Sequence, residues 1–385
     1  MDQNDQSSDA GAAPSRPATP AVVDVRDLDW EAIRRAVDPA ALRVRTSAVV
    51  ERMEQLLNRA EGPGMLFDAD RAGSADRVVR VTADDVPSPT WIIGDLHGDL
   101  LALEAALSQI QRYSASEDQS QPRIIFLGDF IDDEGLALEV LLRVFELIVE
   151  APERICVVAG NHDEALSYDG SRFVSQVSPS DFAEFLNANR TDAGIVRVGQ
   201  VALRLTAHAA RALFFPDGLL VAHGGFPLVD LHAALSATGN WNDPACLGDF
   251  VWARAHPKAP RKIPNRYTRG SQFGHQDFAD FCALSTQLGR PVTHMVRGHD
   301  HVDERYAIYP AYHAHPVLTT VALSRRLNRE RFGPYERAPT LARVVQGSLP
   351  QVYQLYPPSE LINAIFPRPD SSHELATDGV DQASS

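Results

Sequence analysis

Three times in the first half of this chain, a short apolar run leads into a block rich in Gly, Asp, Asn and His, and then into a segment with helical periodicity. The blocks are GDLHG at 94–98, GDFIDDEG at 128–135 and GNHD at 160–163, and the runs before them are WII, IIFL and ICVV. Strands and helices repeated in this order are typical of α/β folds. Because ligands of such sheets gather beyond the carboxyl ends of the strands, we expect the three blocks to meet at one edge.

The rest of the pattern predicts how this core is completed. Apolar residues at three- and four-residue steps predict helices over about 29–59, divided at Pro39. The segment 165–212 is expected to be largely helical and irregular. Further strands are expected at Arg77–Val81, in a hairpin over 214–220, at Met295-Val296, near Val317–Leu323 and near Leu341–Val345. We therefore predict an α/β fold with a central two-sheet β-sandwich flanked by helices.

Composition divides the chain into four parts. Residues 1–22 hold almost no large apolar side chain and are expected to form a disordered tail. A helical lead-in over 23–85 is expected to pack on a core domain over 86–357, which carries every polar block. Residues 358–385 are expected to form a C-terminal tail.

Charge and cysteine content exclude several classes of partner. The formal net charge of −15 argues against a nucleic-acid duplex, because like charges repel. No apolar run is long enough to span a bilayer, and the polar N-terminus differs from a secretory signal. Cys156, Cys246 and Cys282 lack the spacing of metal or disulfide sites, which favours a reducing compartment. We predict a cytoplasmic protein without a membrane partner, while its oligomeric state and export through a disordered N-terminus stay open.

Two further blocks, HGG at 223–225 and RGHDH at 297–301, add histidines to the set. Carboxylate, amide and imidazole groups are the ligands that divalent metals prefer, and Asp129 could bridge two metals with its two oxygens. The candidate ligands are Asp95, His97, Asp129, Asn161, His223 and His299. Such a set fits two cations roughly 3.5–4 Å apart, which can activate water against a phosphoester.

The five blocks resemble those of the phosphoprotein phosphatase family, the serine/threonine phosphatases within the calcineurin-like metallophosphoesterases. The family pattern is GDxHG, GDxxDRG, GNHE, HGG and RxH, and the chain follows it in order over about residues 45–350. One such block would be weak evidence, whereas five in order are strong. The resemblance implies the metallophosphoesterase fold for the core domain and hydrolysis of phosphomonoesters, with a phosphorylated protein as substrate.

The resemblance also implies roles for single residues. The first metal would take Asp95, His97 and Asp129, and the second would take Asp129, Asn161, His223 and His299. His162 would be the general acid that protonates the departing alkoxide, and Asp132 would keep its imidazole charged and oriented. Metal-bound water would be the nucleophile, so no phospho-enzyme is expected. Mn²⁺ is our first choice of divalent metal, with Fe or Zn as alternatives.

One position departs from the family in a way that bears on the substrate. Asp133 stands where the family has a phosphate-binding arginine, and a carboxylate there would repel a phosphate dianion. The stretch 252–270 holds six basic residues and no carboxylate, and we expect Arg269 and Arg254 from it to clamp the phosphate. Arg269 resembles the family's second phosphate-binding arginine, and Arg254 resembles an arginine of bacterial relatives. The tryptophan that anchors this alignment stays open between Trp241 and Trp252.

The GHDH sequence at 298–301 supports a second hypothesis. The broader superfamily uses GHxH, in which the second histidine completes the first metal, so His301 is a further candidate ligand. Protein phosphatases usually lack it, which favours a small phosphoester or a nucleotide polyphosphate as the alternative substrate. A third hypothesis is a catalytically inactive, phosphatase-like binding module, for which Asp133 is the only support.

Overall fold

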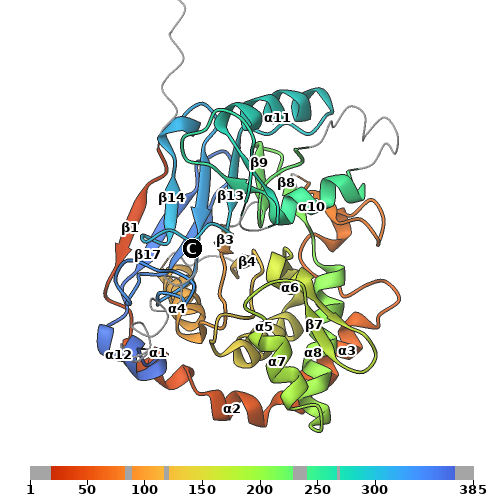
Figure 1. The fold of residues 1–385 in the computed structure, drawn as a ribbon, viewed down its shortest axis with the longest axis vertical. Coiled ribbons are helices and arrows are strands. Elements are labelled where there is room, and N and C mark those ends of the chain that lie inside the picture. The colour runs from red at the N-terminus through yellow and green to blue at the C-terminus, as the bar shows by residue number, and fades with distance from the viewer. Residues whose placement is uncertain (1–18, 83–88, 117–120, 229–240, 267–268, 369–385) are drawn as a thin grey trace, which may run out of the picture.

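The computed structural model describes residues 19–82, 89–116, 121–228, 241–266 and 269–368, and two six-stranded sheets form the centre of this part (Figure 1). The first sheet runs in the order β1 (Val22–Val25), β17 (Gln351–Leu355), β16 (Thr340–Val344), β3 (Thr90–Ile93), β4 (Arg123–Phe126) and β5 (Ile155–Val157). The second runs in the order β14 (Tyr306–Ile308), β15 (Val317–Thr320), β13 (His294–Arg297), β9 (Leu219–Ala222), β8 (Ala212–Phe214) and β2 (Val78–Arg80). The predicted two-sheet core is confirmed.

Helices and two smaller sheets surround this centre. The helices are α1 (Trp30–Ala36), α2 (Pro39–Val44), α3 (Thr46–Leu57), α4 (Leu100–Ser116), α5 (Ala137–Glu150), α6 (Asn161–Ala165), α7 (Asp181–Ala188), α8 (Ala193–His208), α10 (Pro244–Trp252), α11 (His275–Gln287) and α12 (Ser359–Ile365). The smaller sheets pair β6 (Leu166–Tyr168) with β7 (Phe173–Ser175), and β12 (Ser271–Phe273) with β10 (Arg254–Ala255) and β11 (Ile263–Pro264). In Figure 1, α4, α5 and α8 lie on one side of the sheets and α11 on the other.

Successive side chains of the central strands pack alternately against the helices and against the other sheet. On β3, Trp91 and Ile93 belong to the apolar cluster shared with α4 and α5, whereas Ile92 belongs to the cluster between the two sheets. On β9, Val221 faces the same inter-sheet cluster, and Leu220 faces the cluster shared with α10 and α11. Successive residues of a strand point to opposite faces, so a continuous apolar run is what a strand buried on both faces requires. The layers are therefore helix, sheet, sheet and helix.

Strand direction brings the polar blocks together. β3, β4 and β5 are parallel, so the blocks that follow them lie at the same edge of the first sheet. β9 and β13 are likewise parallel in the second sheet, and the remaining two blocks follow these strands. A bridge between Asp95 and Val321 ties the two edges to each other. Five blocks spread over some two hundred residues thus converge at one end of the sandwich.

The predicted helices and strands are confirmed, and the structure adds strands that the sequence did not predict, among them β1, β6, β7 and β17. Pro39 begins α2 behind the N-cap Asp38, whose side chain accepts from the Ala41 N–H, so the predicted division of the N-terminal helices is correct. Within 165–212, β6 and β7 form a hairpin that the sequence did not signal. β1 and β17 are also additions, because four- and five-residue strands are too short for a periodicity to stand out.

The proposed domain boundaries cut across paired elements. β2 lies in the predicted lead-in, and it pairs with β8 of the predicted core domain. β1 begins at Val22, the last residue of the predicted disordered tail, continues into the lead-in and pairs with β17, so the tail ends earlier than predicted. At the other end, α12 lies in the predicted C-terminal tail and buries Leu361 and Ile362 against the core. The disorder predicted for most of the two tails falls on residues 1–18 and 369–385, which lie outside the described residues.

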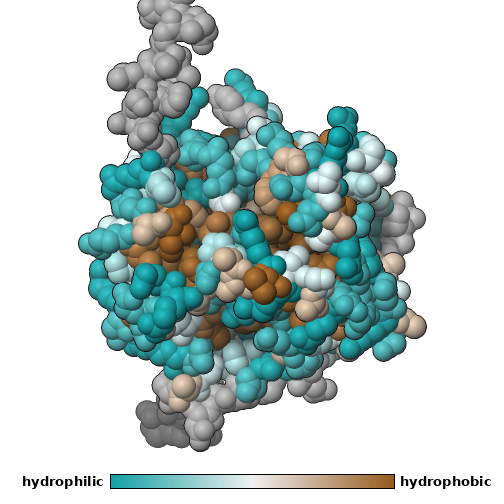
Figure 2. All heavy atoms as spheres, turned by 90° about the horizontal axis from the view of Figure 1, so that it is seen from below, coloured by the Kyte–Doolittle hydropathy of each residue, from teal (hydrophilic) through white to brown (hydrophobic). Residues whose placement is uncertain are grey.

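One face of the molecule has a mixed surface. Hydrophobic side chains gather across its middle and hydrophilic ones frame them (Figure 2). Among the large apolar side chains of the described part, Val44 and Phe332 are the most exposed, at 86% and 81%. Single exposed apolar side chains are normal on a protein surface. None of the described helices combines the length and the apolar character that a bilayer crossing needs.

Candidate active site

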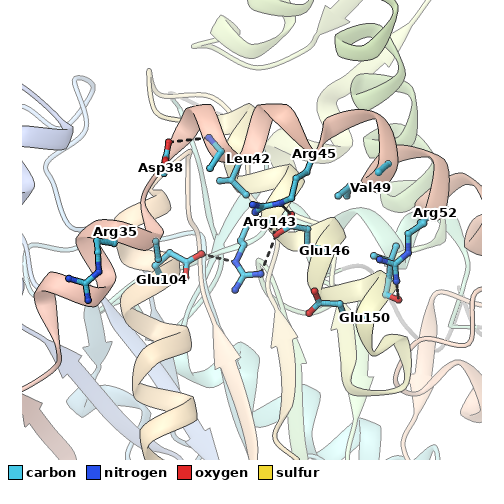
Figure 3. A pocket seen from close by; sticks show the side chains of 14 residues that line it. Arg35, Asp38, Leu42, Arg45, Val49, Arg52, Glu104, Arg143, Glu146 and Glu150 are labelled. Carbon is cyan, nitrogen blue, oxygen red and sulfur yellow. Dashed lines mark hydrogen bonds and ion pairs between the residues drawn. The ribbon is translucent and has the colours of Figure 1, made fainter.

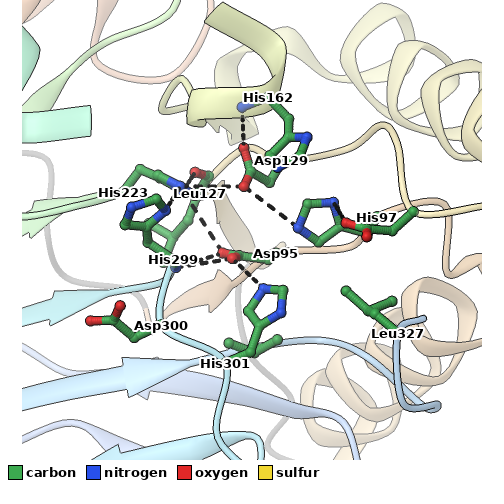
Figure 4. Close-up of polar contacts among 12 residues, drawn as sticks. Asp95, His97, Leu127, Asp129, His162, His223, His299, Asp300, His301 and Leu327 are labelled. Atoms are coloured by element: carbon green, nitrogen blue, oxygen red, sulfur yellow. Dashed lines mark hydrogen bonds and ion pairs between the residues drawn. The ribbon is translucent and has the colours of Figure 1, made fainter. Parts of the chain in front are cut away.

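Seven candidate ligands from the five blocks lie around one point at the end of the two sheets (Figure 4). Asp95 and His97 follow β3, Asp129 follows β4, and Asn161 begins α6 after β5. His223 follows β9, and the block after β13 supplies His299 and His301. Six of the seven side chains are buried, and His301 is nearly so. So many buried polar groups at one place need partners, since burial without them is costly.

Several residues of the blocks have an unfavourable backbone conformation, and some of their glycines lie too close to a neighbour for a larger residue to fit. His97, Asp129 and His299 have φ of 37°, 51° and 69°, in the left-handed region that most residues avoid. A Cβ at Gly160 would lie 2.2 Å from both the amide nitrogen and Oδ1 of Asp129. A Cβ at Gly298 would lie 2.2 Å from Asp95 Oδ1. Such outliers cost of order 1–3 kcal/mol each, and they gather where a site holds its groups in place.

The ligand atoms form two neighbouring groups. In the first, Asp95, His97 and His301 each offer an atom within 4.8 Å of the others, and His301 Nε2 lies 3.0 Å from Asp95 Oδ2. In the second, the same holds for Asp129, His223 and His299. Asn161 joins the second group, with its Oδ1 3.1 Å from His223 Nε2.

One carboxylate oxygen lies between the two groups. Asp129 Oδ2 is 3.6 Å from His97 Nε2 and 3.4 Å from His223 Nε2. The other oxygen, Oδ1, accepts a hydrogen bond from the His162 N–H at 2.8 Å. Asp129 is therefore the carboxylate that both groups could share, as expected for a residue that would bridge two cations.

The donor set fits divalent cations, as the ring nitrogens show. His223 Nδ1 donates to Leu127 O at 2.8 Å, which leaves Nε2 without a proton. That nitrogen faces Asn161 Oδ1 and Asp129 Oδ2, which are acceptors too. His97 repeats the arrangement, because its Nδ1 donates to Ile131 O at 2.8 Å and its Nε2 faces Asp129 Oδ2. At His223, lone pairs therefore face one another without a proton between them, which a bound cation would satisfy.

Electrostatics inside the site agree with this view. Burial lowers the pKa of His97 and of His299 well below that of free histidine, and it lowers the pKa of His223 to about 4. Burial, with the nearby Asp95, raises the pKa of Asp129 well above its ordinary value. Burial also opposes the charge of Asp95, but His223 and His301 hold its pKa below the ordinary value. These three imidazoles therefore favour the neutral form, in which a ring nitrogen can bind a metal, and Asp129 needs positive charge beside it to ionise.

His162 and Asp132 form the expected pair. His162 Nδ1 lies 2.7 Å from Asp132 Oδ2, and Asp132 Oδ1 accepts from the Phe182 N–H at 3.1 Å. Burial lowers the pKa of His162 to about 3 and raises that of Asp132 to about 7. We expected Asp132 to keep the imidazole charged, but burial outweighs it here. A charged His162 thus requires additional negative charge nearby.

Asp163, which replaces the family's glutamate, supports the turn. Its carboxylate accepts from the N–H groups of Asp129, Phe130 and Gly160 at 2.7, 3.1 and 3.3 Å. Those three bonds place the two blocks side by side.

The two arginines expected to bind phosphate have different surroundings. Arg254 donates through Nη1 to His299 O and to Asp300 Oδ1, both at 3.1 Å, so it lies directly behind a candidate ligand. Arg269 stacks its guanidinium on the Trp252 ring, with its Cζ 4.6 Å from the ring centroid. Trp252 and not Trp241 is therefore the neighbouring tryptophan. Among the contacts of the described residues, none joins Arg269 to a candidate ligand.

Arg329 is the residue that sequence reasoning missed. Its Nη2 lies 2.9 Å from Asp133 Oδ2 and 3.0 Å from His97 Nε2, and its Nη1 lies 3.5 Å from His162 Nε2. Asp133, expected to repel phosphate, is therefore ion-paired with an arginine. The only signal in the sequence is the arginine-rich run RRLNRER at 325–331, which matches no block of the family.

A separate cavity of about 540 Å³ lies between α2, α3, α4 and α5 (Figure 3). None of the candidate ligands lines it. Two ion pairs lie in its lining: Arg143 Nε lies 2.7 Å from Glu104 Oε1, and Arg45 Nε lies 2.6 Å from Glu146 Oε1. This cavity therefore offers no cluster of free ligands comparable to that of the blocks.

Comparison with known proteins agrees with the site. A family model described as calcineurin-like phosphoesterase matches residues 88–303. The chain is similar to the serine/threonine-protein phosphatase SIT4 of Candida albicans, with 28% identity over 175 residues, which cover 44% of this chain and 50% of that protein. It is also similar to the serine/threonine-protein phosphatase 6 catalytic subunit of Drosophila melanogaster, with 25% identity over 209 residues, which cover 52% and 61%. The chain thus spans about half to three fifths of these relatives.

A solved structure extends the comparison of folds. A protein serine/threonine phosphatase from Saccharomyces cerevisiae superposes with a TM-score of 0.56 and 16% identity, over 85% of this chain and 96% of that one. At this identity the likeness concerns the fold alone. The family model covers more than half of the 385 residues. The five polar blocks of the chain fall within the matched range, and they lie at the shared end of the two sheets. The chain therefore belongs to the calcineurin-like phosphoesterase family.

Proposed function

We propose that this protein hydrolyses phosphomonoesters with two divalent metals, as a phosphatase that resembles the serine/threonine phosphatases. The observation that carries the proposal is the convergence of two ligand groups on the single oxygen Asp129 Oδ2. A phosphorylated protein is the first substrate class, since both curated relatives named above are serine/threonine-protein phosphatases.

Two metal positions follow from the two groups. Asp95, His97, Asp129 and His301 would hold one ion, and Asp129, Asn161, His223 and His299 would hold the other. Mn²⁺ is the first candidate, with Fe or Zn as alternatives, because the mixture of oxygen and nitrogen ligands suits all three. When bound, such a pair lowers the pKa of water toward neutrality and neutralises charge on a phosphoryl group.

His162 is proposed as the proton donor to the leaving alkoxide. Asp132 fixes its ring through Nδ1, so Nε2 is the atom left to act. Burial keeps the imidazole neutral in the absence of substrate, and a phosphate dianion would raise its pKa by direct attraction. The acid would then be charged only when a substrate is present.

Arg254 and Arg269 remain proposed contributors to phosphate binding. Arg254 has the stronger support, because it lies against His299 and its Nε is buried without a hydrogen-bond partner. Loss of kcat/KM in Arg269→Ala would support a role for Arg269, and unchanged kcat/KM would remove it.

A small phosphoester or nucleotide polyphosphate is the second candidate substrate. The observation that favours it is His301, whose Nε2 lies beside Asp95 and whose Nδ1 lies 3.2 Å from Glu330 Oε1. A panel of phosphopeptides, nucleotide polyphosphates and simple phosphate esters, assayed with added Mn²⁺, would separate the two substrate classes.

The decisive test combines metal analysis with one variant. We expect about two metal ions per chain and turnover of a chromogenic phosphate ester. His162→Asn should keep both ions and lose about 10²- to 10⁴-fold in kcat, the usual contribution of a general acid. A chain that binds no metal, or one that binds metal and turns over nothing in the panel, would be the inactive binding module instead.

A further inference from the structure

We propose that Arg329 binds the substrate phosphate in this protein, in the role that the family gives to an arginine at position 133, and that Asp133 holds Arg329 while no phosphate is bound. The inference rests on the proposed function, since it concerns the same site. It adds a residue that the motif pattern does not contain.

The guanidinium of Arg329 reaches the centre of the site. It contacts Asp133, His97 and His162 at 2.9, 3.0 and 3.5 Å. These three residues form a third cluster with the geometry of a metal site. Because the guanidinium already lies among them, this cluster is filled by a cation that the chain itself provides.

The loop that carries Arg329 is held firmly at its base. Glu330 accepts from both terminal nitrogens of the buried Arg305, at 2.6 and 2.8 Å, and also accepts from the Leu327 N–H at 2.9 Å. Leu327 is fully buried in a small apolar cluster with Val321 and Leu323. Because Leu327 and Glu330 are both fixed, the backbone between them is fixed as well, and the Arg329 side chain is directed into the site.

Two further bonds tie this loop to the blocks. The N–H and hydroxyl of Ser324 donate to Asp99 Oδ2, both at 2.7 Å, just after the first block. Arg325 Nη2 donates to Asp133 O at 2.7 Å. The backbone of Asp133 and the loop of Arg329 are therefore bonded to each other, which keeps the ion pair aligned.

Charge explains why the pair exists. A buried carboxylate needs a counter-charge, and the Arg329 guanidinium supplies one at 2.9 Å. The Asp133 side chain is almost fully buried, at 1% exposed, whereas that of Arg329 is 34% exposed. The carboxylate is thus fixed, and the guanidinium has room to shift toward solvent.

The Arg329 guanidinium must shift in this way when a metal ion binds at His97. His97 Nε2 is a candidate ligand atom, and it cannot face both a metal ion and Arg329 Nη2 at 3.0 Å. A long arginine side chain can move outward without disturbing the loop, toward the mouth of the site where a phosphate would lie. There its planar donors match two oxygens of a terminal phosphate. The ligand class is therefore a dianionic phosphate group, from a monoester or free in solution.

The test measures inorganic phosphate binding to the Mn²⁺-loaded protein by calorimetry. Arg329→Ala should weaken phosphate binding by about 10- to 100-fold, as expected for a charge-assisted hydrogen bond. The Mn²⁺ content should not fall, and the KM for a phosphomonoester should rise more than kcat falls. Arg329→Lys should recover part of the affinity. The matched control is Arg331→Ala, an exposed arginine of the same loop with the same loss of charge, and it should change affinity less than about twofold.

The outcomes separate this inference from the proposed function. If Arg329→Ala binds phosphate as Arg331→Ala does while the wild type turns over, Arg329 has no such role and the proposed function stands. If Arg329→Ala loses Mn²⁺, the residue supports the metal site and the inference is wrong. A wild-type protein that binds Mn²⁺ but neither binds phosphate nor turns over a phosphoester would overturn both.

Discussion

Two regions supply side chains to the same site by different means: the five polar blocks, and the loop between β15 and β16 that carries Arg329. The blocks place their residues by local backbone geometry, with glycines and left-handed residues directly after strands. The loop places Arg329 by contacts between distant residues, above all Glu330 with Arg305. Local geometry leaves a motif in the sequence, whereas long-range pairing does not. The five blocks of the site can therefore be predicted from the sequence, whereas the contribution of the Arg329 loop can be seen only in the folded structure.

The largest expected effect on metal binding and activity comes from altering the blocks. Gly160→Ala would push a methyl group to 2.2 Å from Asp129 N and Oδ1, so the carboxylate between the two ligand groups must shift. We expect loss of bound metal and of activity, with about 1–3 kcal/mol of destabilisation from overpacking. Metal analysis and chemical denaturation would measure both effects.

Gly62→Ala is the control for this change. Gly62 also has a positive φ, of 88°, but a Cβ there meets no atom within 4 Å. It should cost about 1–2 kcal/mol for the left-handed backbone and leave the metal content unchanged. Equal metal content in the two variants would mean that close packing at Gly160 does not position the ligands.

The next effect tests the anchor of the loop. Glu330→Gln would leave the buried Arg305, whose side chain is 1% exposed, without its counter-charge. Removing one partner of a buried pair costs about 3 kcal/mol or more. Because Glu330 also contacts His301 Nδ1 at 3.2 Å, we expect about tenfold weaker metal binding as well.

Urea denaturation and Mn²⁺ titration would check this second prediction. Glu360→Gln, an exposed carboxylate in the first turn of α12, is the control and should change stability by less than about 0.5 kcal/mol. If both variants were equally stable, the loop would not depend on the pair between Glu330 and Arg305.

A smaller effect is expected from the carboxylate that holds Arg329. Asp133→Asn keeps an oxygen near His97 Nδ1, now 3.2 Å from Asp133 Oδ2, but removes the charge that competes with phosphate. We expect the Mn²⁺-loaded variant to bind phosphate about two- to tenfold more tightly, the scale of one partly exposed ion pair. Calorimetry with inorganic phosphate is the measurement. Weaker binding would show that Asp133 does more than hold Arg329.

The smallest effect concerns acid sensitivity away from both regions. Burial alone would raise the pKa of Asp68, but His208 and Arg71 hold it below the ordinary 3.8. A depressed folded-state pKa contributes stability that is present above the unfolded-state pKa and is lost as pH falls below it. The difference in unfolding free energy between wild type and Asp68→Asn should therefore be about 1–2 kcal/mol at pH 5–7 and shrink below about pH 4. A difference that grows on acidification would contradict this sign.

The blocks show how far sequence reasoning reaches in this protein. Asp95, Asp129 and His223 were predicted as ligands because each directly follows an apolar run, and parallel strands carry such residues to one edge. His301 was predicted from GHDH, and the structure brings it to Asp95. The same reasoning took Asp133 for a lone repulsive charge, since its partner is not adjacent in the sequence.

Local sequence is enough to place the residues whose neighbours along the chain dictate their position: the buried strands, the turns after them and the polar side chains in those turns. Arg329 and Glu330 join this site, and β1 and β17 complete the first sheet, through contacts that form only in the folded molecule. Arg329 meets His97 across 232 residues of chain. A contact over that span is selected by packing and charge in the folded molecule, and no local pattern in the sequence records it.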